Sequence, residues 1–221
     1  MVICGVFAAF AYVCVCVFRI KVEFLTLDIK DAVITTSAML IGPIAGVAVS
    51  LVVAFIEMLT ISSTGFYGFI MNFLSSATFS VVASVMYRSR KNLMSAILGL
   101  VCAAASTTAV MMLANLLITP LYYTYFVGIG MSVSAVAAFI PKLLLPFNLT
   151  KAILNATLVM IIYKPIATAL RRAKIIKSSA NENKYSIGVR TVAVTLGAAV
   201  ILALCLVVFF VVLNAEIIPI F

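Results

Sequence analysis

Three polar residues within an apolar stretch are spaced so that they could bind a ligand together. Asn148, Lys151 and Asn155 follow Pro146 at intervals that place them on one face of a helix. Amides both donate and accept hydrogen bonds, and an ammonium group donates them, so this face suits a polar small molecule. If the stretch crosses a membrane, a lysine facing lipid costs roughly 2.5–3.5 kcal/mol. We therefore expect Asn148 and Lys151 to face a site, whereas Asn155 could equally bond a neighbouring helix.

The residues that the chain lacks exclude most forms of catalysis. Histidine, which is the commonest general base and metal ligand, does not occur. The five cysteines form no C-x-x-C pair, so we expect no metal site and no redox site. Acidic residues are scarce, and the chain has no Gly-x-x-x-x-Gly-Lys-Ser/Thr loop that could bind ATP. The sequence therefore favours a binding protein without a cofactor over an enzyme.

The composition is that of an integral membrane protein. Of the 221 residues, 66% are hydrophobic and 10% are charged, and the mean hydropathy is +1.31. A soluble domain is about half apolar and about a quarter charged. Several apolar runs exceed the roughly 20 residues that span a bilayer as a helix, and they lack the alternation of barrel strands. We therefore predict an all-α membrane fold.

Charged residues and turn signals divide the chain into apolar segments, which we expect to be helical. Their ranges are 2–18, 32–41, 44–60, 66–87, 93–118, 141–163 and 190–213. Gly42-Pro43 marks a turn between the second and third segments, and a mixed-charge loop is expected at 19–31. The second segment is too short to cross a membrane without help from its flanks.

The distribution of basic residues predicts the orientation. Ten of the 15 Lys and Arg residues fall on one side of this arrangement: Arg88, Arg90, Lys91, Lys164, Arg171, Arg172, Lys174, Lys177, Lys184 and Arg190. The positive-inside rule makes this side cytoplasmic, with the N-terminus inside. The net charge of +9 then reflects topology and contact with anionic membrane lipid, and we expect no nucleic-acid partner.

Most of the other polar residues gather at the opposite, outer side. Asn72, Asn115 and Asn148 lie near the outer ends of three segments, and Thr26, Asp28 and Asp31 belong to the loop on that side. Glu57 is close to the outer end of its segment, where it could line a site or reach lipid headgroups. This grouping predicts a ligand site at the outer leaflet.

These motifs resemble the substrate-binding S component of energy-coupling-factor (ECF) transporters, most of all its riboflavin-specific branch. The similar stretches are 24–31, 42–46, Thr64-Gly65-x-x-Gly68-x-x-x-Asn72 and Pro146-Phe-Asn-Leu-Thr-Lys151. The resemblance implies a six-helix substrate-binding core at 1–165 in a bacterial cell membrane. A basic cytoplasmic linker would follow at 166–189. An additional transmembrane helix is expected within 190–221, and it has no counterpart in the family.

The resemblance also implies roles for individual residues. Riboflavin would bind beneath the first loop, and a coupling transmembrane subunit and two ATPase subunits would complete the transporter. The residues expected to bind the ligand are Leu25, Thr26, Asp31, Phe66, Gly68, Asn72, Asn115, Asn148 and Lys151. Among them, Asn72 is included because of its expected depth in the membrane. Gly5 and Ala9 form a small-residue pair that would contact the coupling subunit.

The residues by themselves leave other functions open. Apolar walls with a few polar groups are typical of small-molecule pockets in general, so another vitamin such as thiamine or folate remains an alternative. Functions of a different class are a membrane-embedded enzyme and an assembly protein whose polar face binds other helices. A self-contained secondary transporter is less favoured, because we see no inverted repeat.

Overall fold

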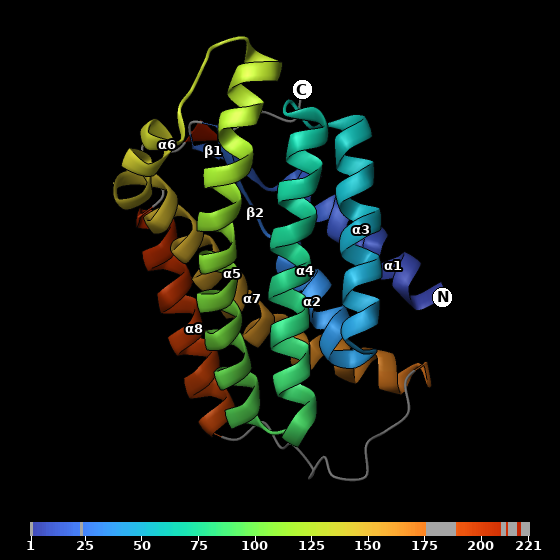
Figure 1. Cartoon of the computed structure of the whole chain (residues 1–221). Helices are drawn as coiled ribbons and strands as arrows, with labels where there is room; N and C mark the ends of the chain where they lie inside the picture. The colour runs from blue at the N-terminus through green and yellow to red at the C-terminus, as the bar shows by residue number, and fades with distance from the viewer. Residues whose placement is uncertain (1, 23, 176–188, 209–210, 212–215, 218–221) are drawn as a thin grey trace.

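A computed structural model describes residues 2–22, 24–175, 189–208, 211 and 216–217 of the chain. Most of these residues form a helical bundle (Figure 1). The helices are α1 Val2–Val17, α2 Lys30–Leu40, α3 Pro43–Thr60, α4 Gly65–Arg90, α5 Leu93–Tyr122, α6 Val133–Phe139, α7 Leu145–Arg172 and α8 Val189–Val207. Two π-helical turns, Tyr123–Val127 and Ile140–Leu144, continue α5 and lead into α7.

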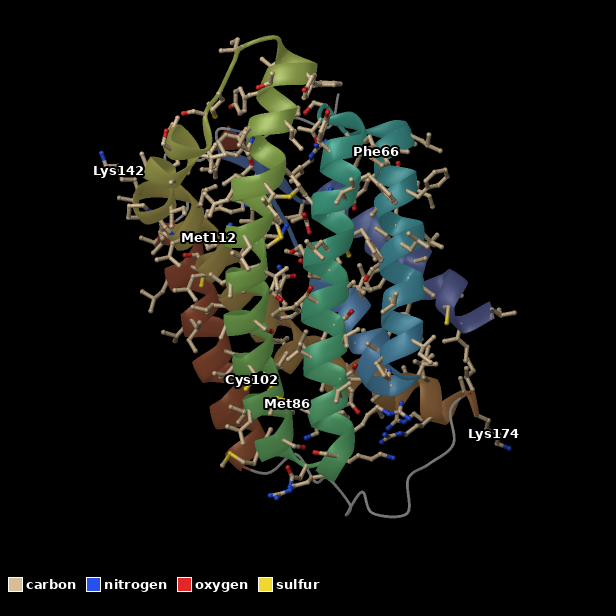
Figure 2. All side chains as sticks on the ribbon, in the orientation of Figure 1. Phe66, Met86, Cys102, Met112, Lys142 and Lys174 are labelled. Atoms are coloured by element: carbon tan, nitrogen blue, oxygen red, sulfur yellow. The ribbon has the colours of Figure 1, made fainter. Side chains whose placement is uncertain are left out.

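The bundle has the dimensions and surface of a membrane protein. Four of the described helical segments are long and apolar enough to cross a bilayer: Pro43–Thr60, Gly65–Arg90, Leu93–Val127 and Val133–Arg172. Large apolar side chains such as Leu117 and Val85 are exposed. Figure 2 shows side chains projecting outward around the bundle. Exposed aliphatic groups around a whole bundle indicate that it is surrounded by lipid. The predicted all-α membrane fold is therefore confirmed.

The first loop differs from the expected irregular segment, because it is a β-hairpin. Strands β1 (Arg19–Val22) and β2 (Leu25–Asp28) pair antiparallel, with Arg19 opposite Asp28. A short third strand, β3 (Glu216–Ile217), pairs with the other edge of β1. Ile20, Val22 and Leu27 are buried and alternate with more polar residues, which is the period of a strand with one face on the core.

Other boundaries also differ from the expectation. Helix α5 and its π-helical turn continue to Val127, and α6 lies in a stretch for which the sequence predicts no element. Helix α7 continues through the first residues of the expected linker, and most of that linker, 176–188, lies outside the described residues. Much of the expected segment beyond Val207 also lies outside them.

Helix α2 is the central buried element. Its 11 residues rise only about 16 Å at 1.5 Å per residue, which is less than the hydrocarbon core of a bilayer. All of its residues from Lys30 to Met39 are buried, and it packs against α1, α3, α4 and α7. The turn at Gly42-Pro43 is confirmed: Pro43 begins α3, and Arg88 on α4 donates a hydrogen bond of 2.7 Å to the carbonyl of Ile41.

Small residues let these helices approach closely, and Gly46 on α3 is the tightest such position. A Cβ added at Gly46 would lie 2.7 Å from Ala38 Cβ on α2 and 2.9 Å from Ser80 Oγ on α4. Both distances are too short for van der Waals contact. The packing of α2, α3 and α4 therefore requires glycine at this position.

We predict that Gly46→Ala lowers the stability of the protein in detergent. Overpacking costs about 1–3 kcal/mol, which exceeds the roughly 1 kcal/mol by which alanine favours a helix over glycine. Thermal unfolding of the purified variant measures the effect. Gly197→Ala on α8 is the control, because an added Cβ there meets no atom within 4 Å. Equal midpoints for Gly46→Ala and the unmodified protein would contradict the packing argument.

Candidate functional site

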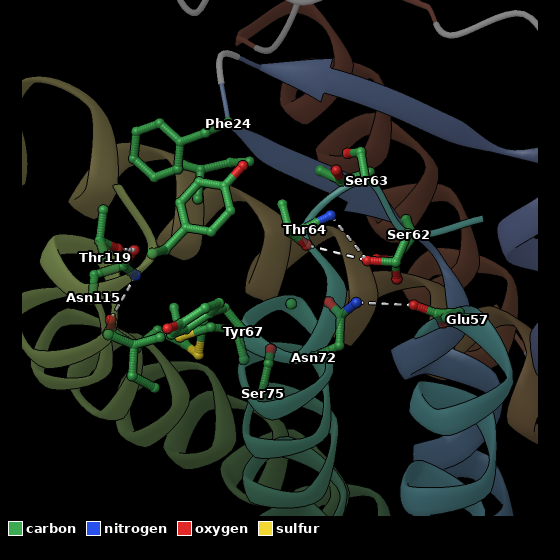
Figure 3. A pocket seen from close by; sticks show the side chains of 18 of the residues that line it. Phe24, Glu57, Ser62, Ser63, Thr64, Tyr67, Asn72, Ser75, Asn115 and Thr119 are labelled. Atoms are coloured by element: carbon green, nitrogen blue, oxygen red, sulfur yellow. Dashed lines mark hydrogen bonds between the residues drawn. The ribbon is translucent and has the colours of Figure 1, made fainter. Parts of the chain in front are cut away.

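A pocket lies beneath the hairpin, at one end of the bundle (Figure 3). Its walls come from β1 and β2, the end of α3, the start of α4, the end of α5 and the start of α7. The basic ends of α4 and α7 lie at the other end of the bundle, where Lys174 is seen in Figure 2. The pocket is therefore formed where the polar helix ends and the first loop meet.

Most of the residues expected to bind a ligand line this pocket. They are Leu25, Thr26, Gly68, Asn72, Asn115, Asn148 and Lys151. Asp31 lies outside the lining: it is buried and accepts a hydrogen bond from Ser76 on α4. Phe66 is 61% exposed, and its ring lies tilted against that of Phe69 with centroids 6.0 Å apart. The rotation of α4 brings Tyr67 and Gly68 to the pocket and turns Phe66 away from it.

Four buried charged residues form a continuous network under the hairpin. Asp28 Oδ2 lies 3.3 Å from Lys30 Nζ and 3.0 Å from Lys151 Nζ. Lys30 Nζ is also 2.8 Å from Glu57 Oε2. Each of these side chains is at most 10% exposed. The network ties β2 to α2, α3 and α7, so it fixes the position of the hairpin over the helices.

The charge state of Asp28 follows from this environment. Burial alone would raise the pKa of its carboxyl, but the ammonium groups of Lys151 and Lys30 lower that pKa to about 2. The carboxylate therefore stays ionised at neutral pH, and both ion pairs are present. The sequence predicts that Asp28 lies in the outer loop but does not identify its ion-pair partners, because the local pattern does not indicate which lysines lie near it in space.

Lys151 and Asn155 on α7 also bind the backbone of the first loop. Lys151 Nζ donates to the carbonyl of Thr26 at 3.3 Å. Asn155 Oδ1 accepts from the amide of Ala32 at 3.0 Å, and its Nδ2 donates to the carbonyl of Asp28 at 3.2 Å. Asn155 is therefore a structural residue that joins α7 to the hairpin and α2. Lys151 has both roles, because it lines the pocket and also holds its roof.

Asn115 and Asn148 present free acceptor or donor capacity to the pocket. Asn115 Nδ2 donates to the carbonyl of Met111 at 2.7 Å, and its Oδ1 accepts from Thr119 Oγ1 at 3.0 Å. Asn148 Nδ2 donates to the carbonyl of Leu144 at 2.8 Å. Within the described residues, no hydrogen bond reaches Asn148 Oδ1. Each amide is thus held by its own helix and keeps at least one position for a ligand.

Aromatic side chains form one wall of the pocket, and the sequence alone did not predict this wall. Tyr67 packs edge-on against Tyr122 with ring centroids 5.9 Å apart, and Phe24 packs against Tyr123 at 5.8 Å. Tyr67 belongs to a motif noted in the sequence, but Tyr122 lies beyond the expected end of its helix at residue 118. Phe24, Tyr67 and Tyr122 give the pocket an aromatic wall near Asn115 and Thr119 (Figure 3).

Glu57 is the other residue whose place the sequence left open. It lines the pocket and is 4% exposed, so it does not reach lipid headgroups. Asn72 Nδ2 donates to its Oε2 at 2.9 Å. Among the residues that the structure describes, no group of three Cys, Asp or Glu side chains is arranged to hold a metal ion. The polar chemistry of the pocket is that of amides, hydroxyls and paired charges.

Gly5 and Ala9 lie on the face of α1 that is turned away from the bundle. The opposite face of α1, with Phe7, Ala8 and Ala11, is buried. Both small residues are exposed, and a Cβ added at Gly5 would meet no atom within 4 Å. This face is therefore open to a partner helix or to lipid.

Comparison with known proteins agrees with this architecture. The model of the family "ECF transporter, substrate-specific component" matches residues 1–163. A curated relative, the riboflavin transporter RibU of Staphylococcus aureus (strain TCH60), is 29% identical over 150 residues, which cover 67% of this chain and 78% of the relative.

A solved structure of the S component of a bacterial ECF transporter superposes with a TM-score of 0.63 at 28% sequence identity. The superposition covers 76% of this chain and 95% of that chain. The matched family consists of components of transporters and is not a family of enzymes. This chain is a multi-pass membrane protein and belongs to the family of substrate-specific S components of ECF transporters.

Proposed function

We propose that the chain is the riboflavin-binding subunit of an ECF transporter, which captures the vitamin at the outer face of a bacterial cell membrane. The observation that carries this proposal is a pocket that combines an aromatic wall with two helix-anchored amides, Asn115 and Asn148. The similarity to a riboflavin transporter supports the same ligand. Riboflavin would be cargo rather than a cofactor.

The pocket suits the two parts of riboflavin. The vitamin has a flat, largely apolar ring system with one polar pyrimidine edge, and a polyol tail. Tyr67 and Phe24 offer aromatic surface for the ring, and the amides of Asn115 and Asn148 can both donate to and accept from its polar edge. The hydroxyls of Ser62 and Thr64 line another part of the pocket, where a polyol would find partners.

The charges that line the pocket favour a neutral ligand. The charged residues among the described lining are two cations, Arg19 and Lys151, and two anions, Asp28 and Glu57. Their formal charges cancel, so a charged ligand would leave an uncompensated charge in a buried site, which is costly. Folate carries carboxylates and thiamine carries a permanent positive charge, whereas riboflavin is neutral at pH 7.

The transport cycle requires partners that supply energy. We propose that the basic end of the bundle faces the cytoplasm, which puts the N-terminus inside and the pocket outside. A coupling transmembrane subunit and two ATPase subunits would then drive release of the vitamin. The exposed pair of Gly5 and Ala9 on α1 lets a helix of the coupling subunit approach closely.

The ligand is tested directly by titrating riboflavin fluorescence with the purified protein in detergent. We expect saturable quenching at nanomolar protein that excess thiamine or folate does not reduce. The absorbance spectrum of the preparation must first exclude flavin that was carried through purification. Binding of thiamine or folate in place of riboflavin would overturn the riboflavin assignment and leave the family membership intact.

We predict that Asn148→Ala weakens riboflavin binding by about 1–3 kcal/mol, because a polar group of the ligand would be left buried without a partner. The same fluorescence titration measures the change. Ser106→Ala on α5 is the control, because Ser106 is half-buried away from the pocket and bonds the carbonyl of Cys102 in its own helix. Unchanged affinity for Asn148→Ala would remove this residue from the site.

We predict that Gly5→Leu or Ala9→Leu leaves riboflavin binding intact and blocks ATP-driven uptake, since a bulky side chain prevents close helix approach. Uptake by cells or vesicles that contain the complete transporter is the measurement. Val85→Leu on the lipid-facing side of α4 is the matched control and should transport normally. Normal uptake by the α1 variants would place the coupling surface elsewhere.

A further inference from the structure

Glu57 has one carboxylate oxygen that the fold does not use. Its Oε2 accepts from Lys30 Nζ at 2.8 Å and from Asn72 Nδ2 at 2.9 Å. Its Oε1 is buried and makes no hydrogen bond to any described part of the chain. A buried acceptor without a partner is energetically costly, and more so when the group is charged. The carboxylate is thus held in place through one oxygen while the other lacks a donor.

The surroundings of Glu57 indicate what kind of donor would reach it. The pocket has two chemically different ends (Figure 3). Tyr67, Asn115 and Thr119 form the aromatic and amide end. Glu57 belongs to the other end, which also contains the hydroxyls of the loop between α3 and α4: Ser62, Ser63 and Thr64.

We propose that Glu57 is a ligand-binding residue that accepts a hydrogen bond from a hydroxyl group of the ligand's polyol tail. This inference rests on the proposed function, and it sets the direction of the ligand: the ring lies at the amide end and the tail at the carboxylate end. A hydroxyl donor satisfies Oε1 without adding charge, so the balance among Asp28, Lys30, Glu57 and Lys151 is preserved. Asn72 then acts as a positioning residue, because its amide orients the carboxylate.

Two flavins with the same ring separate the two ends of the pocket. Riboflavin carries the hydroxylated tail, and lumiflavin has a methyl group in its place. Affinities of the unmodified protein and of Glu57→Gln for both flavins are measured by fluorescence titration. We expect Glu57→Gln to reduce riboflavin affinity roughly tenfold, as for the loss of a charge-assisted hydrogen bond, and to change lumiflavin affinity little.

Two further variants keep the test decisive. Glu57→Gln leaves Lys30 with a weaker partner, which could itself disturb the fold. The double variant Lys30→Met/Glu57→Leu avoids this problem, because it replaces the whole Lys30–Glu57 ion pair with apolar groups. Proteins often tolerate such a replacement. The double variant should show the same selective loss of riboflavin affinity. Asn115→Ala, at the amide end, is the matched comparison and should weaken both flavins by a similar factor.

Each outcome distinguishes the inference from the function on which it rests. If the Glu57 variants weaken riboflavin and lumiflavin equally, Glu57 is only structural and the inference is wrong. The inference is also overturned if the unmodified protein binds lumiflavin as tightly as riboflavin. If the unmodified protein binds neither flavin, the proposed function itself fails, and the assignment of Glu57 fails with it.

Discussion

The ion network of Asp28, Lys30, Glu57 and Lys151 is the interaction on which the rest of this structure depends. It joins four elements through side chains that are at most 10% exposed, and a buried charge requires a partner. Removing one partner of a buried pair costs about 3–5 kcal/mol, because the remaining charge is left uncompensated. The position of the hairpin over the helices, and therefore the roof of the pocket, follows from these pairs.

The pocket has one side that the network holds together and an opposite side made mainly of aromatic rings. Around Asp28 and Glu57, charged and amide side chains hold one another and the backbone of the first loop in place. Opposite them, Tyr67 and Tyr122 contact each other through ring edges. A ligand with a flat ring and a hydroxylated tail matches this division, because each part meets groups of its own chemistry.

The two sides of the helical bundle differ in whether a further helix of the chain covers them. Helix α8 follows the residues that the family model matches and packs against α7, where Cys205 joins the cluster that contains Ile20 and Leu27. Helix α1, on the other flank in Figure 1, keeps its small-residue face exposed. Helix α8 therefore supports the hairpin and α7 from one side and leaves the α1 face free for a partner.

The sequence by itself determined the membrane environment, the approximate helices and the group of polar residues at one end. Hydropathy and the spacing of Asn148 and Lys151 are local properties, so they can be read without a structure. Only the tertiary structure decided that Arg19–Val22 and Leu25–Asp28 pair as a hairpin, since a four-residue alternation is too short to be distinctive. It also decided that Glu57 is buried and that Phe66 points outward. These outcomes depend on the rotation of each helix about its axis and on the pairing of charged residues that lie far apart in the sequence. Packing between the elements sets both.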